Sequence, residues 1–242
     1  MTYFEGFVTP VPTANKDAYL AHAREAYDLI REFGVTRMVE TWGDDIPEGK
    51  HTDFRRAVEA KDGESVLFSW FEYPDKAARD AVNARMMEDP RMEQMSKSMP
   101  FDGKRMVYGG FASILDEGEG GGGTYTDGFV LAVPDAKKDE YRALAEKMAK
   151  VFREQGALRV VEAASDDVKH GKQTDYYRAV KAEDGEHIVF SFIEWPDKTT
   201  RDAAWKTNME SDSAPDEPMP FDGKRMFWGG FEPVFDSKED KA

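Results

Sequence analysis

Two glutamates that sequence alternation places on strands among apolar neighbours are the residues of this chain best suited to chemistry. Residues 35–42 and 65–73 have strand patterns; Glu40 shares a face with Met38 and Trp42, and Glu72 ends a face formed by Val66, Phe68 and Trp70. A carboxylate in apolar surroundings has its charged form disfavoured and its pKa raised, which suits a general acid or base near neutrality. Glu40 and Glu72 are therefore the predicted catalytic residues.

The side chains around these glutamates predict a mostly apolar pocket in which a few cations orient an anionic ligand. The predicted ligand-binding residues are Arg37, Met38, Trp42, Phe68, Trp70, Arg91 and Arg105. The same side chains would also form an ordinary core between two sheets. In that alternative the glutamates pair with Arg37, Arg56 or Arg105 and hold the sheets in register.

Other kinds of site find little support in the sequence. The chain has no cysteine, which excludes disulfides, thiolate metal sites and a cysteine nucleophile. Each of the four histidines is expected at the surface, with none at ligand spacing from another. No GxGxxG or P-loop spacing is present, and no nucleophile elbow surrounds Ser69 or Ser191. The sequence therefore predicts neither a metal site nor a cofactor.

The composition limits the partners of the protein. Its 48 acidic and 33 basic residues give a formal charge of −15, which repels phosphate backbones and anionic membrane surfaces. The first residues, MTYFEGFV, lack the basic start and long apolar run of a signal peptide, and no apolar stretch is long enough to span a bilayer. We expect a soluble cytoplasmic protein whose partner is a small molecule, not nucleic acid or membrane.

The chain contains an internal repeat. The octapeptide MPFDGKRM occurs at 99–106 and at 219–226, and a shift of 122 positions places Gly6 on Gly128 and Arg37 on Arg159. This duplication predicts a first repeat over 1–116, a glycine-rich linker over 117–124, a second repeat over 125–236 and a disordered tail over 237–242. A linker of this composition is expected to be a flexible coil.

Each repeat has the pattern of a ferredoxin-like unit. In the first repeat we expect strands over 3–9, 35–42, 54–60, 65–73 and 105–115, and helices over 16–33 and from about 74 to 90. The order β-α-β-β-β-α-β is close to the split βαβ arrangement. A sheet that is covered by helices on one side must bury its other face, and the second repeat is the expected partner.

Several motifs support a family assignment: Gly6-Phe7-Val8, Arg37-Met38-Val39-Glu40, Thr52-Asp53-Phe54-Arg55, Phe68-Ser69-Trp70, Asp89-Pro90-Arg91-Met92, and MPFDGKRM with Tyr108-Gly109-Gly110-Phe111. Both repeats resemble the YbaA-like family of proteins of unknown function. The resemblance implies the dimeric α/β-barrel superfamily and an α+β fold in which two tandem ferredoxin-like units pack sheet to sheet. Such a fused pair is expected to be monomeric or a weak homo-oligomer. By analogy of fold alone, a catalytic member would be a cofactor-independent oxygenase or an isomerase-like enzyme.

Differences between the repeats suggest where a site would lie. Trp42 is replaced by Ala164, and the segment that contains Arg91 is replaced by a different sequence at 210–214. A pocket that needs Trp42 and Arg91 would exist only beside the first repeat, which is our hypothesis for binding or transformation of a small apolar or aromatic, and also anionic, molecule. The alternative is a non-catalytic structural or ligand-sequestering protein whose barrel is filled by side chains. The repeated octapeptide is expected either to form a turn held by Asp102 or to place Lys104 or Arg105 at a pocket rim.

Overall fold

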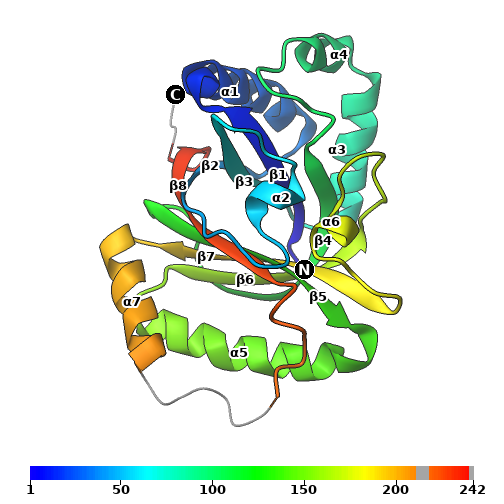
Figure 1. Ribbon diagram of the computed structural model, residues 1–242. Helices are drawn as coiled ribbons and strands as arrows, with labels where there is room; N and C mark the ends of the chain where they lie inside the picture. The colour runs from blue at the N-terminus through cyan, green and yellow to red at the C-terminus, as the bar shows by residue number, and fades with distance from the viewer. Residues whose placement is uncertain (211–217, 240–242) are drawn as a thin grey trace.

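The strands of the protein close into a single antiparallel barrel (Figure 1). The structure is a computed structural model that describes residues 1–210 and 218–239. The strand order around the barrel is β1-β3-β2-β8-β5-β7-β6-β4. The strands are β1 (Tyr3–Pro12), β2 (Arg37–Asp45), β3 (Glu64–Tyr73), β4 (Val107–Gly118), β5 (Tyr125–Pro134), β6 (Arg159–Asp167), β7 (Glu186–Trp195) and β8 (Phe227–Asp236).

Each repeat contributes one four-stranded half of the barrel, and the halves join at two seams. Within the first repeat β1 pairs with both β3 and β4, and β2 pairs with β3. Strand β2 then pairs with β8, and β4 pairs with β6, so both edges of each half are covered by the other repeat. Neither half therefore keeps a free sheet edge. This closed arrangement of two similar halves confirms the predicted α+β fold of two fused ferredoxin-like units.

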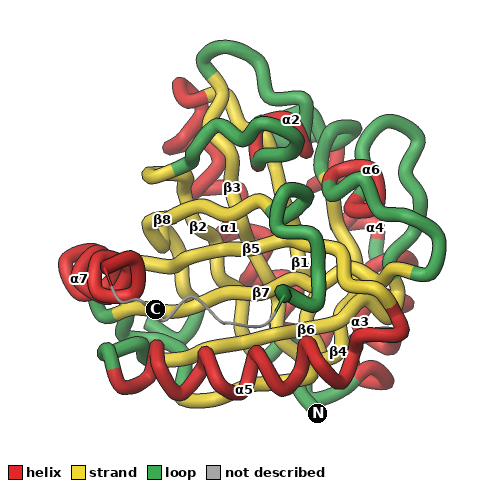
Figure 2. The backbone as a smooth tube through the Cα atoms, turned by 60° about the horizontal axis from the view of Figure 1, so that its bottom comes forward, coloured by secondary structure: helices red, strands yellow, loops and turns green. Residues whose placement is uncertain are grey.

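The long helices lie on the outside of the barrel, as Figures 1 and 2 show for α5 beside β6. The helices are α1 (Lys16–Phe33), α2 (Phe54–Ala57), α3 (Lys76–Glu88), α4 (Pro90–Lys97), α5 (Lys138–Glu154), α6 (Tyr176–Ala179) and α7 (Lys198–Glu210), with short 3₁₀ turns at Thr13–Asn15 and Asp135–Lys137. Helix α1 buries Tyr19, Ala23, Leu29, Ile30 and Phe33 against the sheet and ends at Gly34, whose φ of 120° suits glycine. In the described part of the chain, no helix has both the length and the apolar character needed to cross a membrane.

The strand predicted over 54–60 is wrong, because this segment begins with the short helix α2. The side chain of Asp53 accepts a hydrogen bond of 2.7 Å from the backbone N–H of Arg56, which caps the helix. Asp175 caps α6 through Arg178 in the same way, at 2.8 Å. Local capping therefore outweighs the strand-like composition. Each repeat has the β-α-β-β-α-β order with a short helix, α2 or α6, added before its third strand, and the first repeat also has α4.

Both repeats extend past the boundaries expected from the sequence. Strand β4 continues to Gly118, so residues 117 and 118 of the expected linker pair with Val160 and Arg159 of β6. Residues 237–239 form a turn, in which the backbone N–H of Ser237 donates to the carbonyl of Met38 at 3.0 Å. The remaining tail residues, and the segment 211–217 where the second repeat differs from the first, lie outside the described residues.

The centre of the barrel is filled by equivalent aromatic side chains from the two repeats. The rings of Phe68 and Phe190 stack with centroids 4.3 Å apart, and those of Trp70 and Phe192 with centroids 4.2 Å apart. Since each pair joins residues that match in the two repeats, the local twofold axis passes between them. All four side chains have no measurable exposure. This part of the interior is therefore a packed core.

Candidate functional site

The residues predicted to form one pocket lie on opposite faces of the sheet. Arg37 is paired with Glu72 across β2 and β3, and Val39 with Trp70, so these side chains face the same way, into the barrel. The outward-facing group, beneath α1, consists of Met38, Glu40 and Trp42. The inward-facing group consists of Arg37, Phe68, Trp70 and Glu72. Alternation predicted correctly which side chains share a face within one strand. It could not predict which face of β2 lies on the same side of the sheet as a given face of β3, because that depends on how the two strands pair.

Glu40 lies in a buried polar cluster between the sheet and α1. The hydroxyl of Tyr19 donates to Glu40 Oε2 at 2.5 Å, and the hydroxyl of Ser69 donates to the same oxygen. Burial raises the pKa of Glu40 to about 7, against the opposite effect of these two hydrogen bonds. The raised pKa of Glu40 goes with a packed position, where Trp42 lies edge-on to Tyr19, and its role as an acid or base stays a prediction.

The second repeat keeps the same polar cluster. The Tyr141 hydroxyl donates to Glu162 Oε2 at 2.6 Å, and burial raises the pKa of Glu162 to about 7. Glu162 is half-buried, whereas Glu40 is buried, and Ala164 stands in the place of Trp42. The carboxylate chemistry is thus common to both repeats and does not distinguish the first from the second.

Glu72 belongs to a buried ionic cluster at one end of the barrel, next to the aromatic core. Its Oε1 lies 3.0 Å from Arg37 Nη1 and 2.7 Å from Arg159 Nη1, and it also accepts a hydrogen bond of 3.0 Å from the Trp70 indole. The members of this ionic cluster are Arg37, Glu72, Asp116, Arg159, Glu194 and Asp236. The neighbouring carboxylates raise the pKa of both arginines against the effect of burial. This arrangement corresponds to the alternative in which the glutamates hold the sheets in register.

The repeated octapeptide forms the turn that leads into the last strand of each repeat. Arg105 lies 2.6 Å from Glu64 and 3.0 Å from Asp102, and it donates to the carbonyl of Glu59 at 3.0 Å. The guanidinium group lowers the pKa of the Glu64 carboxyl to about 2. Arg225 makes the equivalent pair with Glu186 at 2.6 Å. Arg105 therefore fastens the turn before β4 to the start of β3, and the octapeptide of the second repeat makes the equivalent contact to the start of β7.

Two further residues differ from their expected surroundings. Arg91 lies on the surface of α4, where it is paired with Asp89 at 2.8 Å and with Glu32 at 3.1 Å, away from Trp42. His187 was expected at the surface but is only 8% exposed; its Nδ1 lies 3.1 Å from Asp135, and burial lowers its pKa. His187 lies at the start of strand β7, opposite Val133 of β5, a pairing that sequence alone could not show.

A pocket of about 440 Å³ lies between α2 and α6, at the end of the barrel opposite the ionic cluster. Its lining comes from equivalent positions of the two repeats, so it lies on the local twofold axis. Its polar lining side chains are Lys50, His51, Thr52, Arg56, Glu59, Gln173, Thr174, Arg178 and Lys181. None of the predicted site residues lines it. The signal that could have identified it is the sequence Thr-Asp followed by Arg three residues later, which occurs in both repeats.

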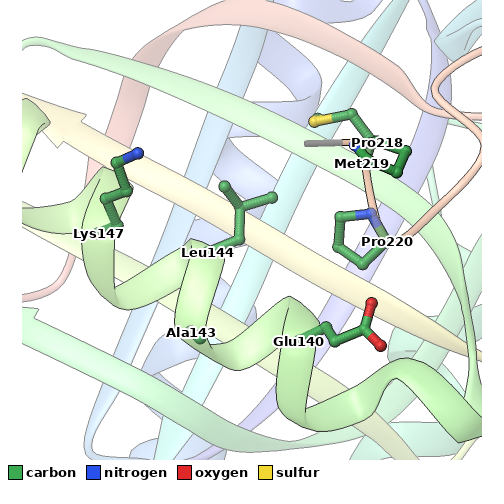
Figure 3. Close-up of a pocket in the computed structure, with 7 residues that line it drawn as sticks. All are labelled: Glu140, Ala143, Leu144, Lys147, Pro218, Met219 and Pro220. Carbon is green, nitrogen blue, oxygen red and sulfur yellow. The ribbon is translucent and has the colours of Figure 1, made fainter. Parts of the chain in front are cut away.

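A second pocket, of about 370 Å³, lies on the outer surface of α5 (Figure 3). Glu140, Leu144 and Lys147 extend from the helix toward Pro218 and Pro220. Because Pro218 is the first described residue after 211–217, the extent of this pocket on that side lies outside the described part of the chain. Within the described residues, no group of His, Asp or Glu side chains is arranged to hold a metal ion.

Sequence comparison places the chain in a family. The model of the family described as protein of unknown function (DUF1428) matches residues 2–103 and again residues 124–223, so the chain belongs to this family. The uncharacterized protein YbaA of Escherichia coli K12 is 58% identical over 117 residues, which is all of that protein and 48% of this chain. The YbaA proteins of Escherichia coli O157:H7 and Shigella flexneri match to the same extent. The relatives are thus one repeat long, and this chain is a tandem fusion.

Solved structures with low sequence identity share the fold. A protein described as a "putative monooxygenase" from Fusobacterium nucleatum has a TM-score of 0.58 at 9% identity, over 97% of this chain and 93% of its own. A similarly described protein from Lactobacillus acidophilus gives 0.55 at 10% identity, over 97% and 95% of the two chains. An anthrone oxidase-like protein gives 0.54 at 12%, over 97% and 92%. At these identities the likeness concerns the barrel alone.

Proposed function

We propose that the protein is a non-catalytic binding protein that holds a small oxyanion-bearing molecule, a phosphate or a carboxylate, in the pocket between α2 and α6. The observation that carries this proposal is the convergence of basic groups from both repeats on one pocket. In this reading the aromatic-filled barrel is the scaffold that fixes the two halves of the site.

The charge of the pocket lining supports an anion. Among the described residues, Lys50 and Lys181 form no ion pair, and the side chains of Arg56 and Arg178 are about half exposed. Each arginine keeps one Nη1 at 3.0 Å from the aspartate that caps its helix, which fixes its direction. The lining holds these four cations against one acidic side chain, Glu59, although the whole chain has a formal charge of −15. It would attract a small anion locally although the whole protein repels extended polyanions.

Two threonine hydroxyls supply neutral donors at the same place. Thr52 and Thr174 line the pocket, and their hydroxyl oxygens are buried with no hydrogen-bond partner among the described residues. A buried hydroxyl without a partner costs about 1–3 kcal/mol. An oxyanion bound between the two threonines would provide an acceptor for both, which favours a ligand with several oxygen atoms.

The positions of the two glutamates predicted as acids or bases favour a binding protein over an enzyme. Glu40 lies outside the sheet beneath α1, and Glu72 is engaged with two arginines in the ionic cluster. Neither lines the pocket, so a ligand held there would meet neither of them. The likeness to monooxygenase-like structures is a likeness of fold and supplies no reacting group to this site.

The test is calorimetric titration of the full chain with inorganic phosphate and, separately, with acetate at low ionic strength. Lys181→Glu and Lys50→Glu are each expected to weaken binding at least about tenfold, which corresponds to about 1.4 kcal/mol. Lys104→Glu, at an exposed lysine outside the pocket, is the matched control. Binding of neither anion, or equal affinity in the pocket and control variants, would reject the proposal. Native mass spectrometry of the purified protein would identify a larger oxyanion that co-purifies.

A further inference from the structure

The glycine-rich segment 119–123 lies across the ionic cluster and is held there by several hydrogen bonds. The backbone N–H of Gly121 donates to Glu194 Oε1 at 3.2 Å, and the N–H of Glu119 donates to the carbonyl of Leu158 at 3.2 Å. The next residue after the segment, Thr124, donates its N–H to the carbonyl of Pro196 at 3.1 Å. A segment that composition predicts to be a flexible coil is therefore fastened at both ends and in the middle.

Gly120 lies where a side chain could not fit. A Cβ at this position would lie 2.6 Å from Glu194 Oε2 and 2.8 Å from Arg159 Nη1, and closer still to Arg37 Nη1. Those distances are too short for real Cβ contacts, and the groups concerned are buried and held by ion pairs. Since the backbone of Gly120 is not in the left-handed region, its requirement for glycine comes from the close approach to the cluster alone.

The C-terminal turn 237–239 binds the same segment from its outer side, and we call this turn the clasp. Lys238 Nζ donates to the carbonyl of Gly120 at 3.2 Å, and the N–H of Gly122 donates to the Glu239 carboxylate. Ser237 anchors this turn to Met38 on β2 through two hydrogen bonds of 3.0 Å: its N–H donates to the Met38 carbonyl, and its hydroxyl accepts from the Met38 N–H. The turn belongs to the second repeat and β2 to the first, so the clasp joins the repeats a second time.

We propose that segment 119–123 is a closing strap, clasped by the turn 237–239, that seals the ionic end of the barrel against water. The buried ions need this cover, because charges in a low-dielectric interior lose part of their mutual attraction when water enters. A one-repeat relative has no segment that joins two repeats, so the strap is a device of the fused chain. The strap lies at the opposite end of the barrel from the pocket between α2 and α6, so its role does not depend on the proposed function.

The experiment is limited proteolysis of the full chain with an endoprotease that cleaves after glutamate, scored by mass spectrometry at Glu117 and Glu119. The wild-type bonds are expected to resist cleavage, because a protease must wait for the strap to open. Gly120→Leu is expected to accelerate cleavage at these two bonds at least about tenfold, since it displaces the strap from the cluster. Gly223→Leu, at an exposed glycine with open space around it, is the control and should cleave like wild type.

A second variant keeps the test decisive if Gly120→Leu fails to fold. Lys238→Ala combined with Glu239→Ala removes the clasp without touching the strap or the cluster, and it should accelerate cleavage severalfold while the thermal unfolding midpoint changes little. Rapid cleavage of the wild-type bonds, or rates at Glu117 and Glu119 that neither variant changes, would overturn the inference.

Discussion

Arg37 of the first repeat and Glu194 of the second form a buried ion pair, with Nη2 and Oε1 2.5 Å apart and side-chain exposures of 1% and 5%. The reciprocal pair, Arg159 with Glu72, is 2.7 Å long. Two crossed ion pairs thus join the repeats at one end of the axis, while stacked aromatic rings join them at its centre. The repeats are therefore matched to each other in charge as well as in shape.

The crossed ion pairs predict a strong dependence of stability on Arg37. Arg37→Met should lower the free energy of unfolding by about 3–5 kcal/mol, because it leaves Glu194 and Asp236 buried without their main counter-charge. Denaturant unfolding measures the change. Arg31→Met, which removes an exposed arginine paired with Asp28, is the control and should change stability by less than about 1 kcal/mol.

A double-mutant cycle should reveal the coupling across the repeats. Glu194→Gln in the Arg37→Met background should cost less than Glu194→Gln alone, since the partner of the carboxylate has already been removed. Additive effects would show that the pair does not act as a unit and would contradict the cross-repeat role assigned to it.

The aromatic stack predicts that large-to-small changes in either repeat weaken the same core. Phe68→Ala and Phe190→Ala should each lower the free energy of unfolding by about 3–5 kcal/mol, because both rings are fully buried and leave a cavity. The double variant should lose less than the sum of the two, since the rings contact each other at 4.3 Å. Phe7→Ala, at a partly exposed ring on the outer face of β1, is the control. Two independent unfolding transitions would contradict a core shared by the repeats.

The close approach of backbone and ring in the barrel predicts an overpacking effect. An added Cβ at Gly6 would lie 2.7 Å from the Phe190 ring, which is itself held by Phe68. Gly6→Ala should therefore destabilise the protein by about 1–3 kcal/mol. Thermal unfolding measures this, with Gly223→Ala, at an exposed glycine, as the control. Partial rescue by Phe190→Leu would identify the ring as the obstacle, and failure of any variant at Phe190 to rescue Gly6→Ala would argue against it.

The sequence predicted much of the fold because duplication and alternation are both local signals. The match of Gly6 with Gly128 defines the repeats, and the apolar stripe of α1 defines its buried face. The segment that begins at Phe54 was mistaken for a strand, because the cap formed by Asp53 competes with a composition that favours strands. When an element is only one turn long, sequence patterns do not show whether the cap or the strand-like composition decides its structure.

The site could be predicted only in part, because it depends on long-range register. Burial of Glu40 follows from its apolar neighbours, but the placement of Glu72 on the other side of the sheet follows from its pairing with Arg37. The threonine and arginine positions that line the pocket between α2 and α6 are visible in each repeat, but nothing in either repeat shows that the two sets meet, since each repeat supplies part of the lining. A site on a twofold axis becomes visible only when the two halves are assembled.

The buried carboxyl of Glu40 predicts a defined pH dependence of stability. Its pKa is raised from 4.5 to about 7 in the folded state, so between these values the folded protein keeps a proton that the unfolded chain releases. The stability contributed by protonated Glu40 is thus full below about pH 4.5 and is lost as the pH rises to about 7. Glu40→Gln has no group that titrates at this position. The free energy of unfolding of wild type relative to Glu40→Gln should therefore fall by about 3 kcal/mol across this window.

Denaturant unfolding at several pH values from 4 to 8 measures this difference directly. Glu162→Gln should reproduce the effect with the same sign, because burial raises the pKa of Glu162 to about 7 as well. Glu154→Gln, at an exposed glutamate on α5, reports what the loss of a surface charge does by itself. If the stability difference between wild type and Glu40→Gln stayed constant across the window, Glu40 would titrate alike in the folded and unfolded states. The polar cluster with Tyr19 and Ser69 would then hold an ordinary carboxylate, and the acid–base character assigned to it would have to be abandoned.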